Sequence, residues 1–529
     1  MNGTGRDHPD SELAMNDARA RSQLASRGRM SPRRFIDSCK WPLVALICFG
    51  LLMGFAFQGS RPLWSTDEGR YVDGALQMLD SGNYLMPAYS PDVLNFSKPP
   101  LTYWVIAGSL ELFGRNTWAA RTPYALAYLL TILLLYAIGK QAVPDKSWLP
   151  GLVYGCSVIP FFAANIASTD VLLTLFEAMA MLGFLRIAFD DTAHHRGRSV
   201  LLTWTGWGLA FLTKGPPALI PWLAIIPFLL IRDGPRGLGR LFSLAGVAAF
   251  LAIGFGWYAI VVLRYHGLLH YYLHREIYDR IFTPTQNRNP GLLGWAKVYL
   301  PVLVLGSLPW WPAVARQARG WLSAGRWRAW RCDRGIELFL LLWFAIPFIV
   351  FCAAQSRLPL YILPLFLPLS LMLARGLRHR VHLRHFRQWI ALAVWVVVLL
   401  VAKAGASYAL HDAHRDNRLI AHQIGATAGS AHYGSVVFVE ATASQYAIQE
   451  HTPWGIRLYN GKPVYAIAWS APQGAAALCR AVRQSSSALL VLDPAIKPAW
   501  VHSKLSDCAI HDAAKVGIWR RHALVVART

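Results

Sequence analysis

Long apolar segments follow one another through most of the chain, separated by short polar connections. A helix of about 20 residues crosses the hydrocarbon layer of a bilayer. By this length the pattern predicts about eleven membrane-spanning helices, at 41–58, 118–139, 147–165, 169–189, 199–213, 215–231, 241–263, 293–315, 336–354, 358–374 and 389–409. At Lys214-Gly215-Pro216 the glycine and proline interrupt the helix, and the lysine would be costly in hydrocarbon. We therefore expect a polytopic, mainly α-helical protein with about 11 to 13 spans and a tight turn there.

The pattern changes beyond about residue 410. Apolar runs become short and rich in β-branched residues, as at 435–439, 489–492 and 523–526, and helix-like or Gly/Pro-containing stretches separate them. This alternation predicts a small α/β domain at 411–529, following a membrane domain at 41–410.

Composition supports the membrane interpretation. Of 529 residues, 15% are charged and 55% are hydrophobic, whereas a soluble domain carries about 25% charged residues. An ordinary cytoplasmic enzyme is thereby excluded. The net charge of +24 would indicate a nucleic acid partner if the basic residues gathered on one solvated face. They lie instead in short runs between apolar segments, so no nucleic acid partner is expected.

These basic runs also predict the orientation of the protein in the membrane, because loops rich in Lys and Arg stay in the cytosol. Residues 1–40 are polar and basic without an apolar core, so they are no signal peptide, and we expect a disordered cytosolic tail. The other basic connections are 140–146, 186–198, 232–240, 316–334 and 375–387. The loops 59–117 and 264–292, together with the C-terminal domain, then face the periplasm, where function is expected.

The first periplasmic loop begins with a helix signal. Ser65-Thr66-Asp67-Glu68 has the form of a capping box, in which Ser65 bonds forward and Glu68 bonds back. An apolar stripe at helical spacing follows, made of Tyr71, Val72, Ala75, Met78 and Leu79, and it ends at Ser81-Gly82-Asn83. The pattern predicts an amphipathic helix lying on the membrane surface.

The same loop carries candidate chemistry. Asp67 and Arg70 lie three residues apart and share a helix face, although Asp67 also suits the helix dipole and Arg70 a lipid phosphate. Lys98, in Ser97-Lys98-Pro99-Pro100, precedes another apolar helix, where a snorkelling interfacial lysine is the alternative.

Five short motifs occur in a fixed order: Asp67-Glu68-Gly69-Arg70-Tyr71, Ser97-Lys98-Pro99-Pro100, Leu112-Phe113-Gly114-Arg115, Thr213-Lys214-Gly215 and Leu360-Tyr361-Ile362-Leu363-Pro364. Together they resemble the ArnT-like (aminoarabinose transferase) branch of the protein O-mannosyltransferase superfamily. Members are GT-C membrane glycosyltransferases that take a sugar from a polyprenyl phosphate. The resemblance runs from about Trp41 to Pro368. The chain departs from the usual pattern at Gly69, where Ala is common, and at the second proline after Lys98.

The resemblance implies a set of site residues, which the predicted orientation places on one membrane face. The set comprises catalytic Asp67 and Asp170; donor phosphate-binding Arg70, Lys98, Lys214, Arg280 and Tyr361; and supporting Glu68, Tyr71 and Arg357. The implied reaction is one displacement with inversion at the anomeric carbon, in which the cations stabilise the departing phosphate. Asp67 is then a general base or, for an anionic acceptor, a positioning charge. Asp170 is alternatively a helix cap.

His266, His270 and His274 recur at helical spacing in the second periplasmic loop, and one face could present them to zinc. We favour an interfacial helix anchored by its tyrosines, so no metal site is expected. Cys479 and Cys508 lie in the periplasmic domain, where an oxidising compartment favours a disulfide.

The resemblance implies an enzyme of the bacterial inner membrane without a cofactor. It moves 4-amino-4-deoxy-L-arabinose, or another pentose or hexose, from undecaprenyl or another polyprenyl phosphate to a lipid acceptor such as lipid A. We expect a monomer. A protein O-mannosyltransferase-type enzyme and a transporter or flippase for lipid-linked sugars are the alternatives. Transporters commonly bind near the midplane between paired repeats, whereas the ionisable residues here gather at one face, which favours the enzyme.

Overall fold

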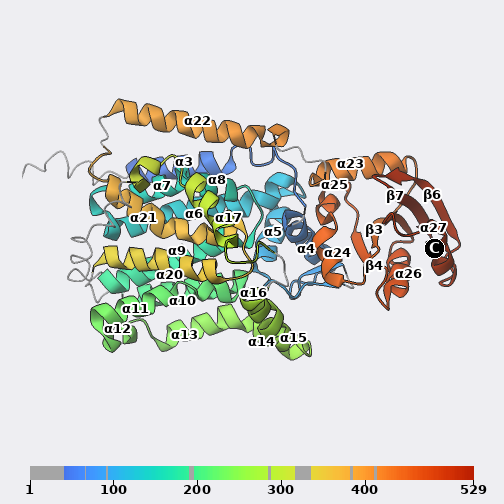
Figure 1. The fold of residues 1–529 in the computed structure, drawn as a ribbon, viewed down its shortest axis with the longest axis horizontal. Coiled ribbons are helices and arrows are strands. Elements are labelled where there is room, and N and C mark those ends of the chain that lie inside the picture. Colours follow the sequence, from blue (N-terminus) through green and yellow to red (C-terminus); the bar gives the residue numbers. More distant parts are fainter. Residues whose placement is uncertain are drawn as a thin grey trace, which may run out of the picture.

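The computed structural model describes residues 41–529 except Thr66 and the segments 91–92, 190–195, 284–287, 316–334, 382–384 and 410–413. The predicted tail at 1–40 lies outside the described residues. A bundle of helices forms one part of an elongated molecule, and a small domain containing a sheet forms the opposite end (Figure 1).

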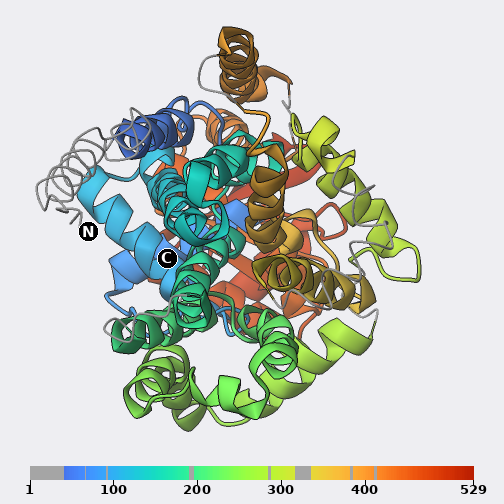
Figure 2. The same cartoon turned by 90° about the vertical axis from the view of Figure 1, so that its left-hand side faces the viewer.

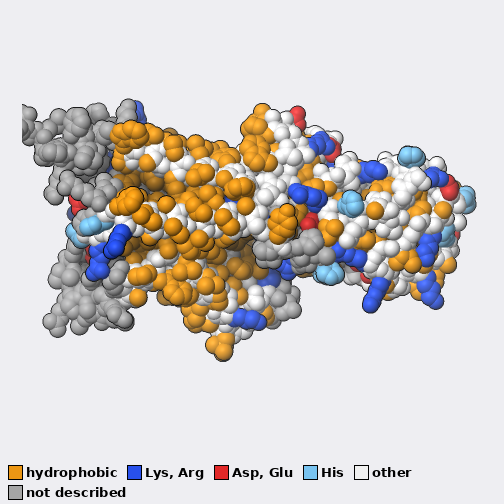
Figure 3. Space-filling model, turned by 90° about the horizontal axis from the view of Figure 1, so that it is seen from above, with side chains coloured by type: hydrophobic (Ala, Val, Ile, Leu, Met, Phe, Trp, Pro, Cys, Tyr) orange, Lys and Arg blue, Asp and Glu red, His pale blue; other side chains and the backbone are white. Residues whose placement is uncertain are grey.

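The helices of the bundle run side by side, and Figure 2 shows them nearly end-on. Among the described residues, seven helical segments are long and apolar enough to cross a membrane: Thr117–Ala142, Thr169–Phe189, Pro216–Asp233, Leu244–Arg264, Ile336–Ala353, Pro359–Leu377 and Phe386–Ala406. They correspond to α6 (Thr117–Ala142), α9 (Thr169–Phe189), η3 (Pro216–Leu219) with α11 (Trp222–Asp233), α13 (Leu244–Phe250) with η4 (Leu251–Phe255) and α14 (Gly256–Arg264), α20 (Ile336–Ala353), η6 (Pro359–Leu365) with α21 (Phe366–Leu377), and α22 (Phe386–Ala409). Hydrophobic side chains cover most of the bundle surface in view, while charged ones lie at the two ends of the bundle and over the sheet domain (Figure 3).

Other helices, shorter or less apolar, occupy the remaining predicted spans. They are α3 (Trp41–Phe55), α7 (Leu149–Cys156), α8 (Val158–Ala163), α10 (Arg196–Lys214) and α17 (Gly294–Gly306). The polytopic helical fold is thus confirmed, and the count of about eleven spans stays a prediction. The remaining helical pieces of this part are α4 (Asp67–Ser81), α5 (Leu101–Phe113), η1 (Pro144–Lys146), α12 (Pro235–Gly239), α15 (Leu268–His270), η5 (Tyr271–Tyr278) and α16 (Asp279–Phe282).

The predicted turn between the fifth and sixth segments is present. Helix α10 ends at Lys214, Gly215 adopts a positive φ of 76°, and Pro216 opens η3. A glycine adopts this conformation without the steric cost that a side chain would bring. The turn therefore leaves Lys214 at the end of a helix.

The C-terminal domain has the predicted α/β character. Its sheet has the order β4-β3-β5-β7-β6, with β3 (Ser435–Glu440) parallel to β4 (Val464–Ala468) and β5 (Ser487–Leu492), and β7 (His522–Arg528) antiparallel to β5 and β6 (Asp512–Trp519). Alternating strand residues face two apolar cores. One core is covered by α23 (Asn417–Ala428), α24 (Gln445–His451) and η7 (Trp454–Ile456), with α25 (Arg457–Asn460) following; the other is covered by α26 (Gly474–Gln484) and α27 (Pro498–Ser506).

Helix α4 lies at the junction of the two domains (Figure 1). It begins at Asp67 and ends before Gly82 as predicted, but other parts of the protein bury both its apolar and its polar residues, which a surface helix would leave partly open. It packs on α5 and η7 and beside β1 (Ala88–Ser90), which pairs with β2 (Val93–Leu94). A Cβ on Gly69 would lie 2.7 Å from the backbone nitrogen of Gly455. This close backbone approach explains why glycine replaces alanine there.

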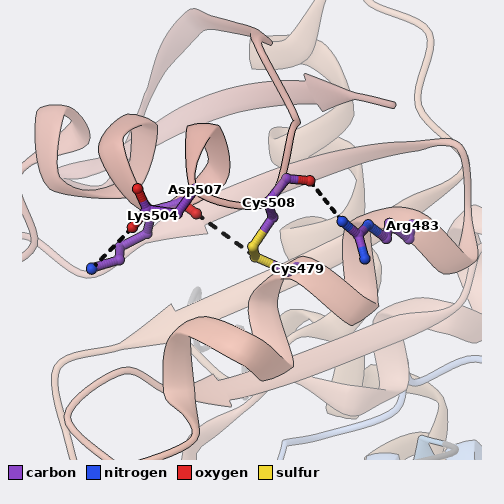
Figure 4. The surroundings of a disulfide bond; sticks show 5 residues. All are labelled: Cys479, Arg483, Lys504, Asp507 and Cys508. Carbon is purple, nitrogen blue, oxygen red and sulfur yellow. Dashed lines mark hydrogen bonds and ion pairs between the residues drawn. A yellow bond between two sulfur atoms is a disulfide. The ribbon is translucent and has the colours of Figure 1, made fainter.

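The predicted disulfide is confirmed. Cys479 of α26 bonds to Cys508, which follows α27, across a separation of 29 residues (Figure 4). Arg483 donates a hydrogen bond of 2.7 Å to the backbone carbonyl of Cys508. The bond ties the two helices that cover one face of the sheet.

We predict that replacing both cysteines by serine lowers the stability of the C-terminal domain by about 3 kcal/mol, because the cross-link restricts the unfolded chain. Alkylation of the denatured, unreduced protein followed by mass spectrometry should leave Cys479 and Cys508 unmodified, while Cys156 serves as the reactive internal control. Free thiols at both positions would contradict the assignment.

Candidate active site

Charged side chains from distant parts of the chain meet where the bundle faces the C-terminal domain. They come from α4, from the start of α9, from the end of α10, from the segments before α17 and η6, and from α24. The arrangement joins residues separated by more than 350 positions in the sequence. The C-terminal domain therefore forms part of the site.

Asp170 and Lys214 form a buried ion pair. Their side chains are 9% and 7% exposed, and the ammonium of Lys214 lies 4.3 Å from the centre of the Tyr361 ring. Asp170 lies in the first turn of α9, and its carboxylate binds Lys214. The structure thus brings together three predicted site residues and favours an ionic role for Asp170 over a helix cap.

Asp67 and Arg70 begin a second, more open network. Arg70 binds the carboxylate of Asp67 and also donates to Glu450 of α24 at 2.6 Å. Glu450 accepts a further bond of 3.0 Å from Arg288, and Arg288 reaches the Tyr361 hydroxyl at 3.5 Å. The side chain of Asp67 is 54% exposed whereas that of Arg70 is 14% exposed. Asp67 therefore presents an accessible carboxylate beside a fixed guanidinium group.

Tyr71 is buried near both candidate catalytic carboxylates. Burial raises the pKa of Tyr71, the charges of Asp67 and Asp170 raise it further, and the charge of Arg70 opposes the shift. Burial likewise raises the pKa of Tyr89 to about 12, although Arg70 opposes the shift. Both phenols stay neutral at physiological pH and act there as hydrogen-bonding groups.

Lys98 lies at a large apolar cavity next to the buried ion pair. The cavity has a volume of about 340 Å³. Its charged lining residues are Lys98, Lys214 and Glu276, and most of the wall consists of apolar and aromatic side chains such as Phe211, Phe255, Tyr258, Val262, Tyr272 and Leu273. A long apolar ligand with an anionic end matches this combination of wall and charge.

Glu68 is a structural residue. Its carboxylate accepts from Arg61 at 2.8 Å, from Arg121 at 3.1 Å, and from the backbone N–H groups of Trp64 and Ala167. Burial alone would raise the pKa of Glu68, but Arg121 and Arg61 outweigh this effect and hold the pKa at about 2. Glu68 thus fixes the start of α4 against α6 and the segment before α9.

The predicted capping box needs correction. Glu68 bonds back to the N–H of Trp64, and the hydroxyl of Ser65 donates to Asn417 of α23 at 3.1 Å. The side chains of Ser65 and Glu68 therefore bond to partners outside the predicted capping box, because the C-terminal domain covers the start of this helix.

Arg357 is a second structural residue, and its partners are backbone carbonyl groups. It is buried and donates to the carbonyls of Asn289, Gly291 and Cys352 at 2.8 to 2.9 Å. These bonds hold the segment that carries Arg288. Arg280 lies in α16, but its side chain is outside the described residues.

Sequence reasoning missed Glu450, Tyr446 and Arg288. Arg288 precedes Asn289, which adopts a positive φ of 52°, and no pattern around it in the sequence indicated a site. Nothing near Glu450 or Tyr446 in the sequence signals chemistry, because their role depends on the packing of α24 against the bundle.

His270 and His274 lie on the helical segment 268–282, whereas His266 precedes it in a turn, so the three predicted histidines do not share one helix. The rings of His270 and His274 stack at 5.3 Å, and His274 stacks on Tyr278 at 5.5 Å. In the described part of the chain, no group of three or more His, Cys, Asp or Glu side chains is placed to hold a metal ion.

The helical membrane domain and the α/β domain together have the GT-C fold, which known proteins share. Residues 97–258 match a family described as dolichyl-phosphate-mannose-protein mannosyltransferase. A crystal structure of ArnT from Cupriavidus metallidurans bound to undecaprenyl phosphate has a TM-score of 0.71 at 19% identity, covering 92% of this chain and 98% of that one. This likeness establishes the fold.

Sequence relatives point to one branch of that class. The chain is 33% identical over 342 residues to the undecaprenyl phosphate-alpha-4-amino-4-deoxy-L-arabinose arabinosyl transferase of Aeromonas salmonicida, covering 63% of this chain and 59% of the relative. It is 31% identical over 363 residues to a transferase of the same description from Pseudomonas fluorescens strain Pf0-1, covering 66% and 62%. The chain thus matches about three fifths of the length of these relatives. The resemblance to the ArnT-like GT-C branch is confirmed.

We predict that Glu68→Gln destabilises the protein by about 3–5 kcal/mol, because two buried arginines lose their anionic partner. Since the folded pKa of about 2 lies below the ordinary 4.5, the contribution of Glu68 is complete above about pH 4.5 and is lost as the pH falls toward 2. Thermal unfolding in detergent measures the change.

Glu337→Gln is the matched control. Glu337 also binds an arginine, Arg375, at 2.8 Å, but its side chain is 44% exposed, so its loss should cost less than about 1 kcal/mol. Equal stability losses in the two variants would contradict the structural role of Glu68.

Proposed function

We propose that the protein is a membrane glycosyltransferase that moves a sugar from a polyprenyl phosphate to a lipid acceptor, by one displacement with inversion. The observation that carries the proposal is the apolar cavity with Lys98 and Lys214 on its wall, next to the network that contains the accessible Asp67. A lipid-linked sugar phosphate has the same two parts, a long apolar chain and an anionic group. The relatives described as undecaprenyl phosphate-aminoarabinose transferases support this assignment.

The donor phosphate occupies the cationic end of the cavity. Lys214 exchanges part of its interaction with Asp170 for the phosphate, and Tyr361 keeps the ammonium in place through its ring. Lys98 lines the same cavity. Charge-assisted hydrogen bonds from such cations are the strongest that proteins offer to phosphate oxygens. The isoprenoid chain lies along the aromatic wall.

The reaction breaks the bond between the anomeric carbon and the phosphate oxygen while an acceptor oxygen bonds to the same carbon. The electron pair of the broken bond stays on the polyprenyl phosphate, where Lys98, Lys214 and Arg70 stabilise the added charge. Asp67 takes the proton from an acceptor hydroxyl. With an acceptor such as a lipid A phosphate, which is already anionic, Asp67 positions the acceptor and Asp170 shares this task.

The site faces the periplasm in this proposal, with the N-terminus in the cytosol of a bacterium and the protein in its inner membrane as a monomer. The transferred sugar is 4-amino-4-deoxy-L-arabinose or a related pentose or hexose, consistent with the names of the relatives.

The orientation predicts the labelling of single cysteines in spheroplasts. A cysteine at Asn83, which is exposed after α4, should react with a membrane-impermeant thiol reagent in intact cells. A cysteine at His379, which is exposed after α21, should react only after lysis, because basic loops stay inside. The unsubstituted chain gives the background from its own thiols. The reverse labelling would place the site in the cytosol.

For catalysis, Asp67→Asn should leave the protein folded and able to bind undecaprenyl phosphate, while sugar transfer falls by about 10² or more. Lys98→Ala should also weaken donor binding because a phosphate partner is lost, and Lys98→Arg should not restore it because the guanidinium fork differs in shape. The assay follows radiolabelled sugar from a lipid-phosphate donor in liposomes containing lipid A.

Asp145→Asn is the control, since Asp145 is exposed in η1, which follows the far end of α6. It should transfer sugar normally. Normal transfer by a folded Asp67→Asn protein would refute the catalytic assignment. Movement of donor across the bilayer without transfer would indicate a transporter, and transfer to a Ser/Thr peptide in place of lipid A would indicate a protein acceptor.

A further inference from the structure

One arginine of the C-terminal domain binds two carboxylates of α4. The guanidinium group of Arg457, in α25, lies 3.3 Å from the carboxylate of Asp73 and 2.6 Å from that of Asp80, and it donates a further bond of 2.9 Å to Gln77. The three partners recur at helical spacing, so they share one side of α4. Helix α25 packs on α4 (Figure 1). This contact therefore joins the C-terminal domain to the membrane part of the chain.

The two carboxylates have different surroundings. Asp80 is 36% exposed and accepts a second bond, of 2.6 Å, from Arg115, whereas Asp73 is completely buried. Within the described part of the chain, the Oδ2 atom of Asp73 has no hydrogen-bond partner. An ionised carboxylate there would keep one oxygen both buried and unsatisfied, which is costly. A protonated carboxyl group at Asp73 avoids most of this cost because it is neutral.

The neighbouring charges are consistent with a proton on Asp73. Burial raises the pKa of Asp73 to about 7, the charge of Arg457 opposes the shift, and the charge of Asp80 adds to it. Although burial alone would raise the pKa of Asp80, hydrogen bonds from Arg115 and Arg457 hold it below its usual range. Asp80 is therefore ionised wherever Asp73 titrates, and it keeps Arg457 bound when Asp73 is neutral.

The other elements that pack closely on α4 are α5, β1 and η7. They bring the phenol of Tyr103, from α5, and the phenol of Tyr89, from β1, which stacks on Trp454 of η7. Burial raises the pKa of both phenols, so both stay neutral while Asp73 titrates. The protonation of Asp73 thus depends on its burial and on the two charged groups already described.

Docking of α25 on α4 is linked to this proton. When α25 leaves α4, Asp73 meets water and its pKa returns to about 3.9. Because the docked form binds the proton more tightly, low pH favours docking. The contribution of the proton is complete below about pH 4 and falls about tenfold in the docking equilibrium for each further pH unit. It is lost above the docked pKa of about 7.

We propose that Asp73 and Arg457 form a pH-sensitive switch, which holds the C-terminal domain against α4 at mildly acidic pH and loosens it above neutral pH. The inference goes beyond the proposed transferase function and does not require it. The same domain places Glu450 on Arg70. Loosening of the domain therefore also takes a partner away from the charged network that contains Asp67.

Hydrogen exchange followed by mass spectrometry, on the full-length protein in nanodiscs between pH 5 and 8, tests the switch. The peptide 454–461 reports on η7 and α25. Asp73→Asn keeps the neutral form at every pH, so wild type and variant are compared at the same pH, where the chemical exchange rates and the histidine charges are equal. The exchange rate of this peptide in wild type, relative to Asp73→Asn, should rise about tenfold per pH unit from pH 5 to 7 and level off above.

Other peptides and variants distinguish undocking from unfolding. Peptide 445–451, which carries Glu450, should follow peptide 454–461, whereas peptide 435–440 from the central strand β3 should stay protected at every pH. Asp507→Asn removes an exposed carboxylate that pairs with Lys504, so it should behave as wild type. Asp80→Asn should raise exchange of peptide 454–461 at every pH, and its exchange should still increase with pH because Asp73 remains.

Exchange of peptide 454–461 in wild type that is constant from pH 5 to 7, after correction for the chemical rate, would overturn the inference without any variant. The same pH dependence in wild type and in a folded Asp73→Asn protein would also overturn it, because another group would then be the sensor. A rise confined to wild type and to the carboxylate controls, with β3 protected throughout, would establish the switch whether or not the protein transfers sugar.

Discussion

The arrangement of the site depends on one buried carboxylate, Glu68, held between Arg61 and Arg121. Burying an ion is costly unless its partners satisfy it completely, and here two guanidinium groups and two backbone N–H groups do so. The resulting cluster fixes the first turn of α4 to the bundle. Asp67 and Arg70 flank Glu68 on the same turn, so their positions relative to α9 and the apolar cavity follow from this interaction. A different residue at Glu68 would release the two side chains on which the proposed chemistry relies.

The C-terminal domain completes the site rather than standing beside it. Arg457 of α25 binds Asp73 at 3.3 Å and Asp80 at 2.6 Å, which fastens the domain along α4. Glu450 then enters between Arg70 and Arg288 and keeps two like charges near one another. Without that carboxylate the guanidinium groups would repel each other, so the domain sets the spacing of the cations. Membrane bundle and soluble domain thus share a single electrostatic network.

The sequence predicts those features of the fold and the site that depend on residues close together in the chain. Apolar length and local breakers such as Gly215 and Gly82 predict helices and their ends, because these signals are local. The position of Lys214 at a helix end, and hence near Asp170, follows from the same local signals combined with loop charge. The burial of α4 on its polar face could not be predicted, because its partners Asn417 and Arg457 lie hundreds of residues away. The role of Glu450 could not be predicted for the same reason. A carboxylate on a short helix has no distinguishing sequence pattern, and only the fold brings it to two arginines.

The central claim is that the apolar cavity beside the Asp170–Lys214 pair holds the lipid phosphate donor. An experimental structure of the full-length protein with undecaprenyl phosphate in a lipid nanodisc tests it most directly. The account predicts phosphate oxygens within hydrogen-bonding distance of Lys98 and Lys214, with the isoprenoid chain along Phe211, Phe255 and Tyr258. A phosphate bound away from Lys98 and Lys214, with this cavity empty of lipid, would contradict it.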